Sequence, residues 1–369
     1  MRVAIPDAPI APGATARATL RVLMVHVGNP IDEHDPCTSR LQMRSLDTGD
    51  PSWYRKKDII NATDQMRSLN AVNVNVEYGF FSGRRSPATL LRAGLRIRRI
   101  ARSQRAEVVH VLWGITAGLI AVIFAGCPVV ISFCGSDLFG NVDRQGRRML
   151  AGRASRLLSQ LSALGARRII VKSEKMRDVL WAATRHKSIV IPNGVDRDRF
   201  VPMAREEARA RLGWSSSSQV MLFFPGEAAA VKNAPLAEAV TVRVQELMPS
   251  VTLLCVDNVA HDELVLYYNA ADVMLLTSFH EGSNNSLKEA MCCNLPIVSV
   301  DCGDARERLG GVRNSFVVDQ YDAGRLADAI VTVLERGERS DGRLYTDVLA
   351  LDQIASRLRL VYEAAAGAR

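Results

Sequence analysis

Short, almost uninterrupted apolar runs recur along the chain, and segments with apolar residues at helical spacing separate them. The clearest runs are Arg21–Val27, Val108–Leu112, Val129–Phe133, Val220–Phe224 and Val273–Thr277. Runs without polar alternation are typical of strands in a parallel sheet that is covered on both faces. The repeated order of strand and helix predicts an α/β protein with two Rossmann-like, doubly wound domains that face one another across a cleft.

The segment from Val108 to Phe133 imitates a membrane span, because it is almost free of charge and exceeds the roughly 20 residues that a spanning helix needs. His110, Gly114 and the break at 126–128 interrupt it. We therefore interpret it as a strand, a buried helix over Thr116–Phe124 and a second strand.

Polar and apolar spacing also predicts the helices. We expect them near Thr38 and over Asp58–Leu69, Thr89–Gln104, Arg144–Leu164, Ser173–Thr184, Asn233–Met248, His261–Ala270, Ser286–Cys293, Ala323–Arg336 and Leu351–Ala366. Residues 1–19 are rich in Ala, Pro and Gly and predict a loose tail.

The length of 369 residues exceeds the roughly 250–300 residues at which single cores stop growing, so two domains are expected. The Pro192-Asn193-Gly194 turn marks the boundary between them. We predict an N-terminal domain over 1–190, a C-terminal domain over 191–350, and a last helix over 351–369 that packs back towards the first domain.

Composition restricts the class of partner. A hydrophobic content of 48% and a charged content of 23% are ordinary for a globular protein, whereas the net charge of +8 indicates an acidic partner. Basic residues and aromatics do not interleave, so nucleic acid is not expected. The helix predicted over 89–104 carries five arginines: it is either a solvated helix on the sheet or a contact with an anionic membrane surface or a diphosphate lipid.

The seven cysteines are odd in number, and none forms a C-x-x-C pair. They indicate reduced, buried thiols rather than disulfides or a zinc site. The N-terminus lacks the continuous apolar stretch of a signal peptide. The expected location is cytoplasmic, including a peripheral position at the inner face of the membrane.

The candidate chemistry is concentrated in residues 271–303, where Glu281 and Glu289 stand on either side of a predicted helix start. Glu289 has two explanations. Ser286 and Glu289 match a capping box, which would be purely structural. Alternatively, both carboxylates accept hydrogen bonds from ligand hydroxyls.

The start of that helix favours the second explanation, because free backbone N–H groups at a helix N-terminus bind anions. The small residues expected there are Gly282, Ser283, Asn284, Asn285 and Ser286. A ligand that carries both phosphate and hydroxyl groups is a nucleotide sugar. Lys232 follows a strand and the Gly226 turn and would add a charge for the diphosphate; its structural alternative is a solvated lysine at a helix start.

Residues 168–300 resemble the donor half of family 4 glycosyltransferases, which have the GT-B fold. The resemblance rests on IPNGVD with a following Phe, on Gly226 with Lys232 six residues later, on NAADVMLLTS and on EGSNNSLKEAMCCNLPIVSVDCGD. The last stretch is similar to the E-x(7)-E signature of the family. The first domain is similar only through VVHV with a following WG and through SFCGSDL.

The resemblance implies a role for each matching residue. Glu281 would lie by the transferred sugar, Glu289 would hold the ribose hydroxyls, and Lys232 would neutralise the leaving diphosphate together with the amides of 282–286. It further implies retention of anomeric configuration and catalysis without a metal or another cofactor, with the nucleoside-diphosphate sugar as the donor substrate.

The sequence departs from the family pattern at three places. Glu227 stands where the family usually has an arginine, and Cys134 stands where many members have a histidine near the sugar. A helix and strand that many members carry between 256 and 261 are missing. His110 is a candidate substitute for the histidine, as general acid/base or acceptor contact; its alternative is a locally bonded histidine. Asp137 and the loop 28–39 are expected on the acceptor side.

We therefore predict a glycosyltransferase that moves a sugar from a nucleoside-diphosphate sugar to a saccharide or lipid-linked saccharide acceptor, in surface polysaccharide or glycoconjugate assembly. Two alternatives stay open: a non-catalytic nucleotide-sugar-binding protein of the same fold, and another GT-B enzyme such as a sugar-nucleotide epimerase. An NAD-linked oxidoreductase is disfavoured, because no G-x-G-x-x-G follows the first strand.

Overall fold

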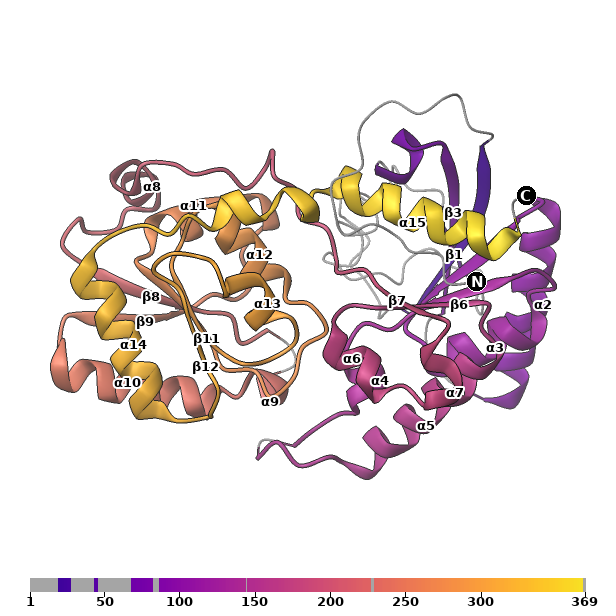
Figure 1. Cartoon of the computed structure of the whole chain (residues 1–369), viewed down its shortest axis with the longest axis horizontal. Coiled ribbons are helices and arrows are strands. Elements are labelled where there is room, and N and C mark those ends of the chain that lie inside the picture. The colour runs from indigo at the N-terminus through magenta and orange to yellow at the C-terminus, as the bar shows by residue number, and fades with distance from the viewer. Residues whose placement is uncertain are drawn as a thin grey trace. The chain divides into compact units, whose positions relative to one another are not determined.

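The computed structural model describes residues 19–27, 43–45, 68–81, 86–143, 145–226 and 229–367. The chain forms two compact units. Unit 1 comprises Met1–Gly140, Leu150–Pro192 and Leu351–Arg369, and unit 2 comprises Asn141–Met149 and Asn193–Ala350. Figure 1 shows a parallel sheet with helices in each unit. The helices expected near Thr38 and over 58–67, the loop 28–39 and Glu227 lie outside the described residues.

The sheet of unit 1 is parallel throughout its described pairings, with the strand order β2-β3-β1-β4-β5-β6-β7. Its strands are β1 Leu20–Val27, β2 Met43–Ser45, β3 Val74–Phe81, β4 Val108–Leu112, β5 Val129–Ser132, β6 Arg168–Val171 and β7 Ser188–Val190. The helices of unit 1 are α2 Pro87–Ser103, α3 Thr116–Phe124, α4 Ser136–Phe139, α5 Leu150–Gly165, α6 Glu174–Val179, α7 Ala182–Arg185 and α15 Leu351–Ala366.

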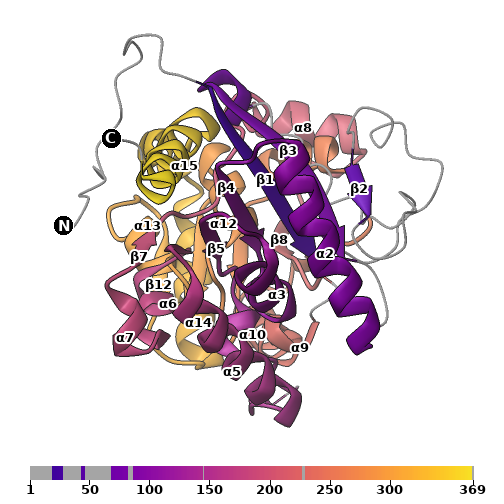
Figure 2. The same ribbon diagram turned by 90° about the vertical axis from the view of Figure 1, so that its right-hand side faces the viewer.

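Alternate residues of each strand in unit 1 enter different cores. Leu23 and Val25 of β1 pack in one hydrophobic cluster with α2 and α3, whereas Val22 and Met24 pack in another with α15. Helices α2, α3 and α5 lie together on one face of the sheet, as Figure 2 shows. Burial on both faces explains why the strands read as unbroken apolar runs.

The apolar segment from 108 to 133 folds as β4, α3 and β5, which confirms the strand-helix-strand interpretation. In the part of the chain that the structure describes, we find no helix with the length and apolarity needed to cross a bilayer.

Unit 2 contains a second parallel sheet, with the described order β12-β11-β10-β8-β9. Its strands are β8 Gln219–Phe223, β9 Val251–Cys255, β10 Val273–Leu276, β11 Ile297–Val300 and β12 Phe316–Val318. Its helices are α8 Arg205–Leu212, α9 Ala229–Lys232, α10 Ala234–Leu247, α11 Leu264–Ala270, α12 Asn285–Cys292, α13 Ala305–Leu309 and α14 Ala323–Arg336, with 3-10 turns η2 His261–Glu263, η3 Gly342–Tyr345 and η4 Asp347–Leu349.

Helices α10 and α14 pack against one another, on the face of the sheet opposite α11 and α12 (Figure 1). The apolar residues of α14 explain its position, because Leu326, Ile330 and Val333 recur at helical spacing and are all buried. Asp322 caps this helix by accepting the N–H groups of Gly324 and Arg325. Strand β9 is followed directly by η2 and α11, so no further helix or strand lies between residues 256 and 261, as the sequence predicts.

The structure differs from the sequence predictions in several helices. The basic helix expected from Arg144 begins at Leu150, because a bridge between Val142 and Arg148 in the preceding segment, which belongs to unit 2, replaces the first part of the expected helix. The helix expected over Ser173–Thr184 is interrupted at Leu180, which has an extended backbone. Helix α8 was missed, since its charged sequence REEARARL has a weak apolar face.

Candidate functional site

The end of α9 is hydrogen-bonded to the segment after β10 at the carboxyl edge of the unit 2 sheet. Thr277 donates its hydroxyl to the carbonyl oxygens of Lys232 (2.7 Å) and Asn233 (3.2 Å), and the Phe279 N–H donates to Val231 O at 2.9 Å. Gly226, at the turn after β8, has a positive φ of 54° that favours glycine. These contacts fix the backbone that carries Lys232 beside the loop after β10.

Lys232 and Glu281 meet side chain to side chain in this edge. Lys232 Nζ lies 2.5 Å from Glu281 Oε1, and the two side chains are 21% and 17% exposed. The same carboxylate oxygen accepts hydrogen bonds from Ser278 Oγ at 2.9 Å and Asn284 Nδ2 at 3.3 Å. The structure therefore brings together two predicted site residues that are 49 positions apart in the chain.

Helix α12 begins one residue earlier than predicted, and Asn284 is its N-cap. The Asn284 side chain accepts the Leu287 N–H at 3.0 Å, while Asn285 and Ser286 occupy the first turn of the helix. The capping box with Ser286 and Glu289 is therefore wrong, because Ser286 lies within the helix. The early amides of α12 have no intrahelical partner and are suited to an anion.

Glu289 lies in the second half of α12 and is only 8% exposed. Its carboxylate is hydrogen-bonded to two side chains from the segment after β9. His261 Nε2 lies 3.0 Å from its Oε1, and Tyr268 donates its hydroxyl to its Oε2 at 2.8 Å. Burial acts to raise the pKa of Glu289, but the hydrogen bonds from His261 and Tyr268 and the charge of Lys288 hold it below the ordinary value. Glu289 is thus a buried, ionised acceptor.

A second set of hydrogen bonds, centred on Lys288, holds the same loop. Lys288 is completely buried and donates to Asn193 O at 2.8 Å and Ser283 Oγ at 3.1 Å. Ser283 in turn donates to the buried carboxylate of Asp304 at 2.8 Å. Gly303 has a φ of 55°, and a Cβ there would lie 3.0 Å from the Cβ of Glu281, so only glycine lets these loops approach so closely. This network ties the loop before α12 to Asp304 and to Asn193.

His110, the candidate general acid/base or acceptor contact, lies inside a strand of unit 1. It is the central residue of β4 and is fully buried, with Nδ1 2.8 Å from Tyr362 Oη and Nε2 2.7 Å from Ser132 Oγ. Burial and the charge of Lys172 lower its pKa to about 3. A neutral imidazole with both nitrogens bonded supports the structural alternative for His110 rather than a general acid/base.

Asp137 and Cys134 lie together in the turn after β5, in unit 1. Asp137 is fully buried, and its carboxylate accepts the backbone N–H groups of Gly114, Cys134, Gly135 and Leu138 at 2.8–3.2 Å. Burial raises the pKa of Asp137 against the effect of these four amides. Asp137 therefore organises the turn, while Cys134 keeps part of its surface exposed.

Sequence reasoning missed His261, Tyr268, Lys288 and Asp304. They occupy the start of η2, the middle of α11, α12 and the turn before α13. His261 and Lys288 could have been found from the sequence, because Lys288 lies within the stretch 271–303 and His261 begins the helix predicted just before that stretch. Tyr268 reads as an ordinary core aromatic. Among the described residues, no group of three or more His, Cys, Asp or Glu side chains is arranged to hold a metal.

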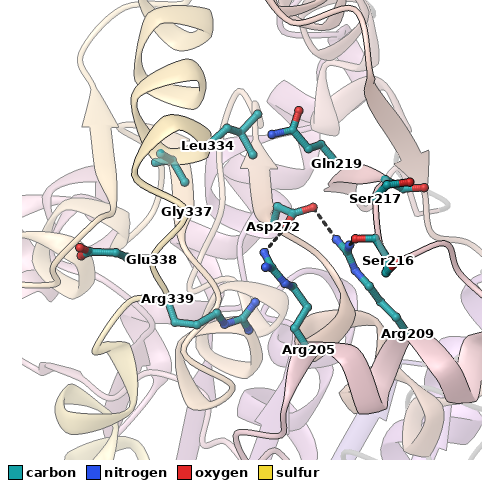
Figure 3. Close-up of a pocket in the computed structure, with 12 residues that line it drawn as sticks. Arg205, Arg209, Ser216, Ser217, Gln219, Asp272, Leu334, Gly337, Glu338 and Arg339 are labelled. Atoms are coloured by element: carbon teal, nitrogen blue, oxygen red, sulfur yellow. Dashed lines mark hydrogen bonds and ion pairs between the residues drawn. The ribbon is translucent and has the colours of Figure 1, made fainter.

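A cavity of about 210 Å³ lies at the opposite, amino edge of the unit 2 sheet. Figure 3 shows Arg205 and Arg209 on one side of it and Arg339 on another, around Asp272. Arg205 Nη1 and Arg209 Nη2 lie 2.7 and 2.8 Å from the two oxygens of Asp272, and Arg339 donates to three backbone carbonyls. This cluster fastens α8 and the segment after α14 to the sheet and is separate from Lys232 and Glu281.

Comparison with known families identifies both halves of the chain. Residues 57–199 match the model described as Glycosyltransferase Family 4, and residues 219–336 match the model described as Glycosyl transferases group 1. The chain belongs to the group 1, family 4 glycosyltransferases. The loop of Glu281 and helix α12 lie within the second match.

Two curated proteins illustrate the sequence relationship. The D-inositol 3-phosphate glycosyltransferase of Mycolicibacterium smegmatis is 28% identical over 199 residues, which are 46% of each chain. The 2-deoxystreptamine N-acetyl-D-glucosaminyltransferase of Streptomyces fradiae is 24% identical over 295 residues, 68% of each chain. The chain spans about half the length of the inositol phosphate relatives that it matches.

Solved structures show the GT-B fold. Sucrose-phosphate synthase from Thermosynechococcus elongatus superposes with a TM-score of 0.73 at 16% identity, over 95% of this chain and 100% of that one. HepE from Anabaena, in complex with UDP and glucose, gives a TM-score of 0.62 at 13% identity, over 92% and 98% of the two chains. The family membership and the fold thus agree with the sequence predictions.

Proposed function

We propose that the protein transfers a sugar, with retention of anomeric configuration, from a nucleoside-diphosphate sugar to a saccharide or lipid-linked saccharide. The observation that carries the proposal is the pairing of Lys232 with Glu281 beside the start of α12. A cation, a carboxylate and free helix amides in one place match the diphosphate, hydroxyl and sugar parts of such a donor.

Each residue of the unit 2 loop has a role in this proposal. The amides at 282–286 and Lys232 bind the diphosphate, and Lys232 stabilises the negative charge that develops as the nucleoside diphosphate leaves. Donor binding replaces the Lys232–Glu281 contact, so that the carboxylate becomes available to hydroxyls of the transferred sugar. Glu289, held ionised by His261 and Tyr268, accepts hydrogen bonds from the ribose.

The first experiment is a thermal-shift screen of nucleoside-diphosphate sugars, because a ligand at about 100 times its Kd stabilises the folded state by about 2.7 kcal/mol. The sugar that gives the largest shift is then incubated with candidate acceptors, and release of the nucleoside diphosphate is measured. Binding followed by release supports transfer. Binding with no release under any acceptor condition supports the non-catalytic alternative, and conversion of the donor sugar without an acceptor supports an epimerase.

A second proposal concerns the acceptor, and a surface of unit 1 supports it. The exposed side chains of helices α2, α3 and α5 form a surface that we call the α2–α5 face. Four leucines of α5 share one stripe and are 39–80% exposed, and Leu91 and Leu95 of α2 are more than half exposed. The exposed arginines of α2 accompany them: Arg92, Arg98, Arg99 and Arg102.

Exposed leucines beside arginines suit the surface of an anionic membrane, where apolar side chains enter the headgroup region and cations bind phosphate. The four leucines of α5 are Leu150, Leu157, Leu161 and Leu164. This face would hold the protein at the inner, cytoplasmic side of a membrane and near a lipid-linked saccharide, as in surface polysaccharide or glycoconjugate assembly.

Sedimentation with vesicles tests this face. We expect binding to vesicles that contain the anionic lipid phosphatidylglycerol and loss of binding in the double variant L157S/L161S. The control is Val242→Ser, which alters an exposed apolar side chain of α10 in unit 2. Equal binding of L157S/L161S and the parent protein would remove the membrane proposal and leave the transfer proposal intact.

A further inference from the structure

Lys172 follows the last residue of β6 and so lies at the carboxyl edge of the unit 1 sheet. Its side chain is only 5% exposed. Within the described parts of the chain, its ammonium forms neither a hydrogen bond nor an ion pair. Its ammonium is not among the fully enclosed side-chain atoms, so it keeps a small contact with solvent. At this low exposure it retains only part of the hydration of a surface lysine, and no protein hydrogen bond within the described residues replaces the rest.

The neighbours of Lys172 do not supply the missing partners. Asp137 and Cys134 are its electrostatic neighbours, and both act to raise its pKa against the lowering effect of burial. The Asp137 carboxylate, however, is already occupied by four backbone N–H groups. His110 carries no compensating charge, because it is neutral and both of its nitrogens are bonded.

The contrast with Lys187 shows that this region can satisfy a lysine. Lys187 Nζ donates to Leu164 O at 2.8 Å and to Ala166 O at 3.2 Å, near the amino edge of the same sheet. Lys172 has no equivalent carbonyl partner among the residues that the structure describes. It lies instead at the edge where parallel α/β sheets bind their ligands, next to the partly exposed Cys134.

We propose that Lys172 binds an anionic group, a phosphate or a carboxylate, of a ligand held by unit 1. Such a group would supply the acceptor oxygens that the protein withholds from this ammonium. The identification of this ligand as the sugar acceptor rests on the proposed function. Anion binding by Lys172 is independent of the proposed function. The protein would then select acidic acceptors, that is, phosphorylated saccharides or saccharides with a uronic acid.

Cys134 provides a local reporter, because its thiol is partly exposed and lies near Lys172. The full-length protein is alkylated with iodoacetamide at constant ionic strength, in chloride, inorganic phosphate or acetate, and modification of Cys134 is followed by peptide mass spectrometry. We expect phosphate to slow Cys134 alkylation at least threefold. Cys255, which is exposed in unit 2, is the internal control and should react at the same rate in each salt.

The test variant is Lys172→Met, which keeps an unbranched side chain and removes the charge. The matched control is Arg167→Gln, which removes one exposed charge before the start of β6. Protection of Cys134 by phosphate should vanish in K172M and persist in R167Q and in Lys172→Arg. Equal Cys134 rates in chloride and phosphate for the parent protein, or undiminished protection in K172M, would overturn the proposal.

Stability separates this binding role from a structural one. Since K172M removes a buried charge without hydrogen-bond partners, its Tm should equal or exceed that of the parent protein, whereas a structural lysine would lower it on removal. Protection by phosphate alone indicates a phosphorylated ligand, and protection by acetate as well indicates that carboxylates also bind. The Lys232→Ala variant should retain protection, so failure of the donor proposal and failure of this one are distinguishable.

Discussion

Each unit buries a lysine near the carboxyl edge of its sheet, and the two lysines differ in their hydrogen bonds. Lys288 in unit 2 is completely buried and donates to a backbone carbonyl and a serine hydroxyl. Lys172 in unit 1 is 5% exposed and has no hydrogen bond within the described residues. Lys288 is therefore part of the scaffold of its loop, whereas the charge of Lys172 is left for a ligand.

One histidine in each unit gives a second comparison, in which the residue of unit 2, not that of unit 1, belongs to the candidate site. His110, which the sequence singled out, is sealed in the core of unit 1 between Ser132 and Tyr362. His261, which it did not, holds the buried carboxylate of Glu289 in unit 2. A position near a sheet edge that is predicted from the sequence is therefore not enough to identify a site residue, because the hydrogen bonds in the folded chain decide whether the side chain is available.

The largest expected effect concerns Lys232, the cation of the unit 2 loop. Lys232→Ala should lower kcat for sugar transfer about 10²–10³-fold, the cost of removing one group that stabilises a developing negative charge. The measurement is release of nucleoside diphosphate under saturating donor. The control is Arg243→Ala, which removes an exposed cation of α10. Activity within a few fold of the parent would show that Lys232 only pairs with Glu281.

The buried state of His110 is tested by the pH dependence of stability. Its pKa of about 3 in the folded state lies below the ordinary histidine pKa of 6.5, so the unfolded chain binds more protons between these values. The stabilisation that depends on neutral His110 is complete above pH 6.5 and falls as pH decreases, by up to about 1.4 kcal/mol per pH unit.

Urea unfolding at pH 7 and pH 5 measures this effect. The free energy of unfolding should fall by about 1–2 kcal/mol more in the parent protein than in His110→Gln. His186→Gln, which alters an exposed histidine, should behave as the parent. If His110→Gln retained the full pH dependence, His110 would be accessible to protons, and its predicted role as an acid/base would return.

Glu289 has a smaller expected effect, on binding rather than turnover. Glu289→Gln should weaken donor binding about tenfold, or about 1.4 kcal/mol, because the amide accepts fewer hydrogen bonds from the ribose. Calorimetry at pH 7 measures this, with the exposed Glu246→Gln as control. Because the folded pKa of Glu289 is lowered, its contribution to stability is complete above pH 4.5 and is lost as pH falls through the folded pKa. Unchanged donor affinity in Glu289→Gln would show that Glu289 has a structural role and does not bind the donor.

The smallest effect distinguishes the two caps proposed for α12. Asn284→Ala should lower the free energy of unfolding by about 1 kcal/mol, because the Leu287 N–H loses its acceptor. Ser286→Ala should change it by less than about 0.5 kcal/mol. Chemical denaturation of the two variants gives both values. A larger loss in Ser286→Ala than in Asn284→Ala would restore the capping box.

Local pattern was enough to predict much of the fold. The bounds of α14 and α15 match their predicted ranges, and β4, α3 and β5 occupy the segment that imitates a membrane span. These elements have a strong apolar period, so burial alone specifies them. Helix α8 was not predicted, because its fixed position comes from Arg205 and Arg209 pairing with Asp272, more than sixty residues away.

The sequence by itself determined the alternation of strands and helices and the family, and it singled out the stretch 271–303 with Lys232 as the proposed place for donor chemistry. Spacing and residue type suffice for these, since they follow from local backbone geometry and side-chain charge. Only the tertiary structure decided which groups are already bonded. It paired Glu281 with Lys232 and Glu289 with His261, and it enclosed His110, because such contacts join segments that are far apart in the sequence. It also left Lys172 buried without a hydrogen bond to any residue that the structure describes.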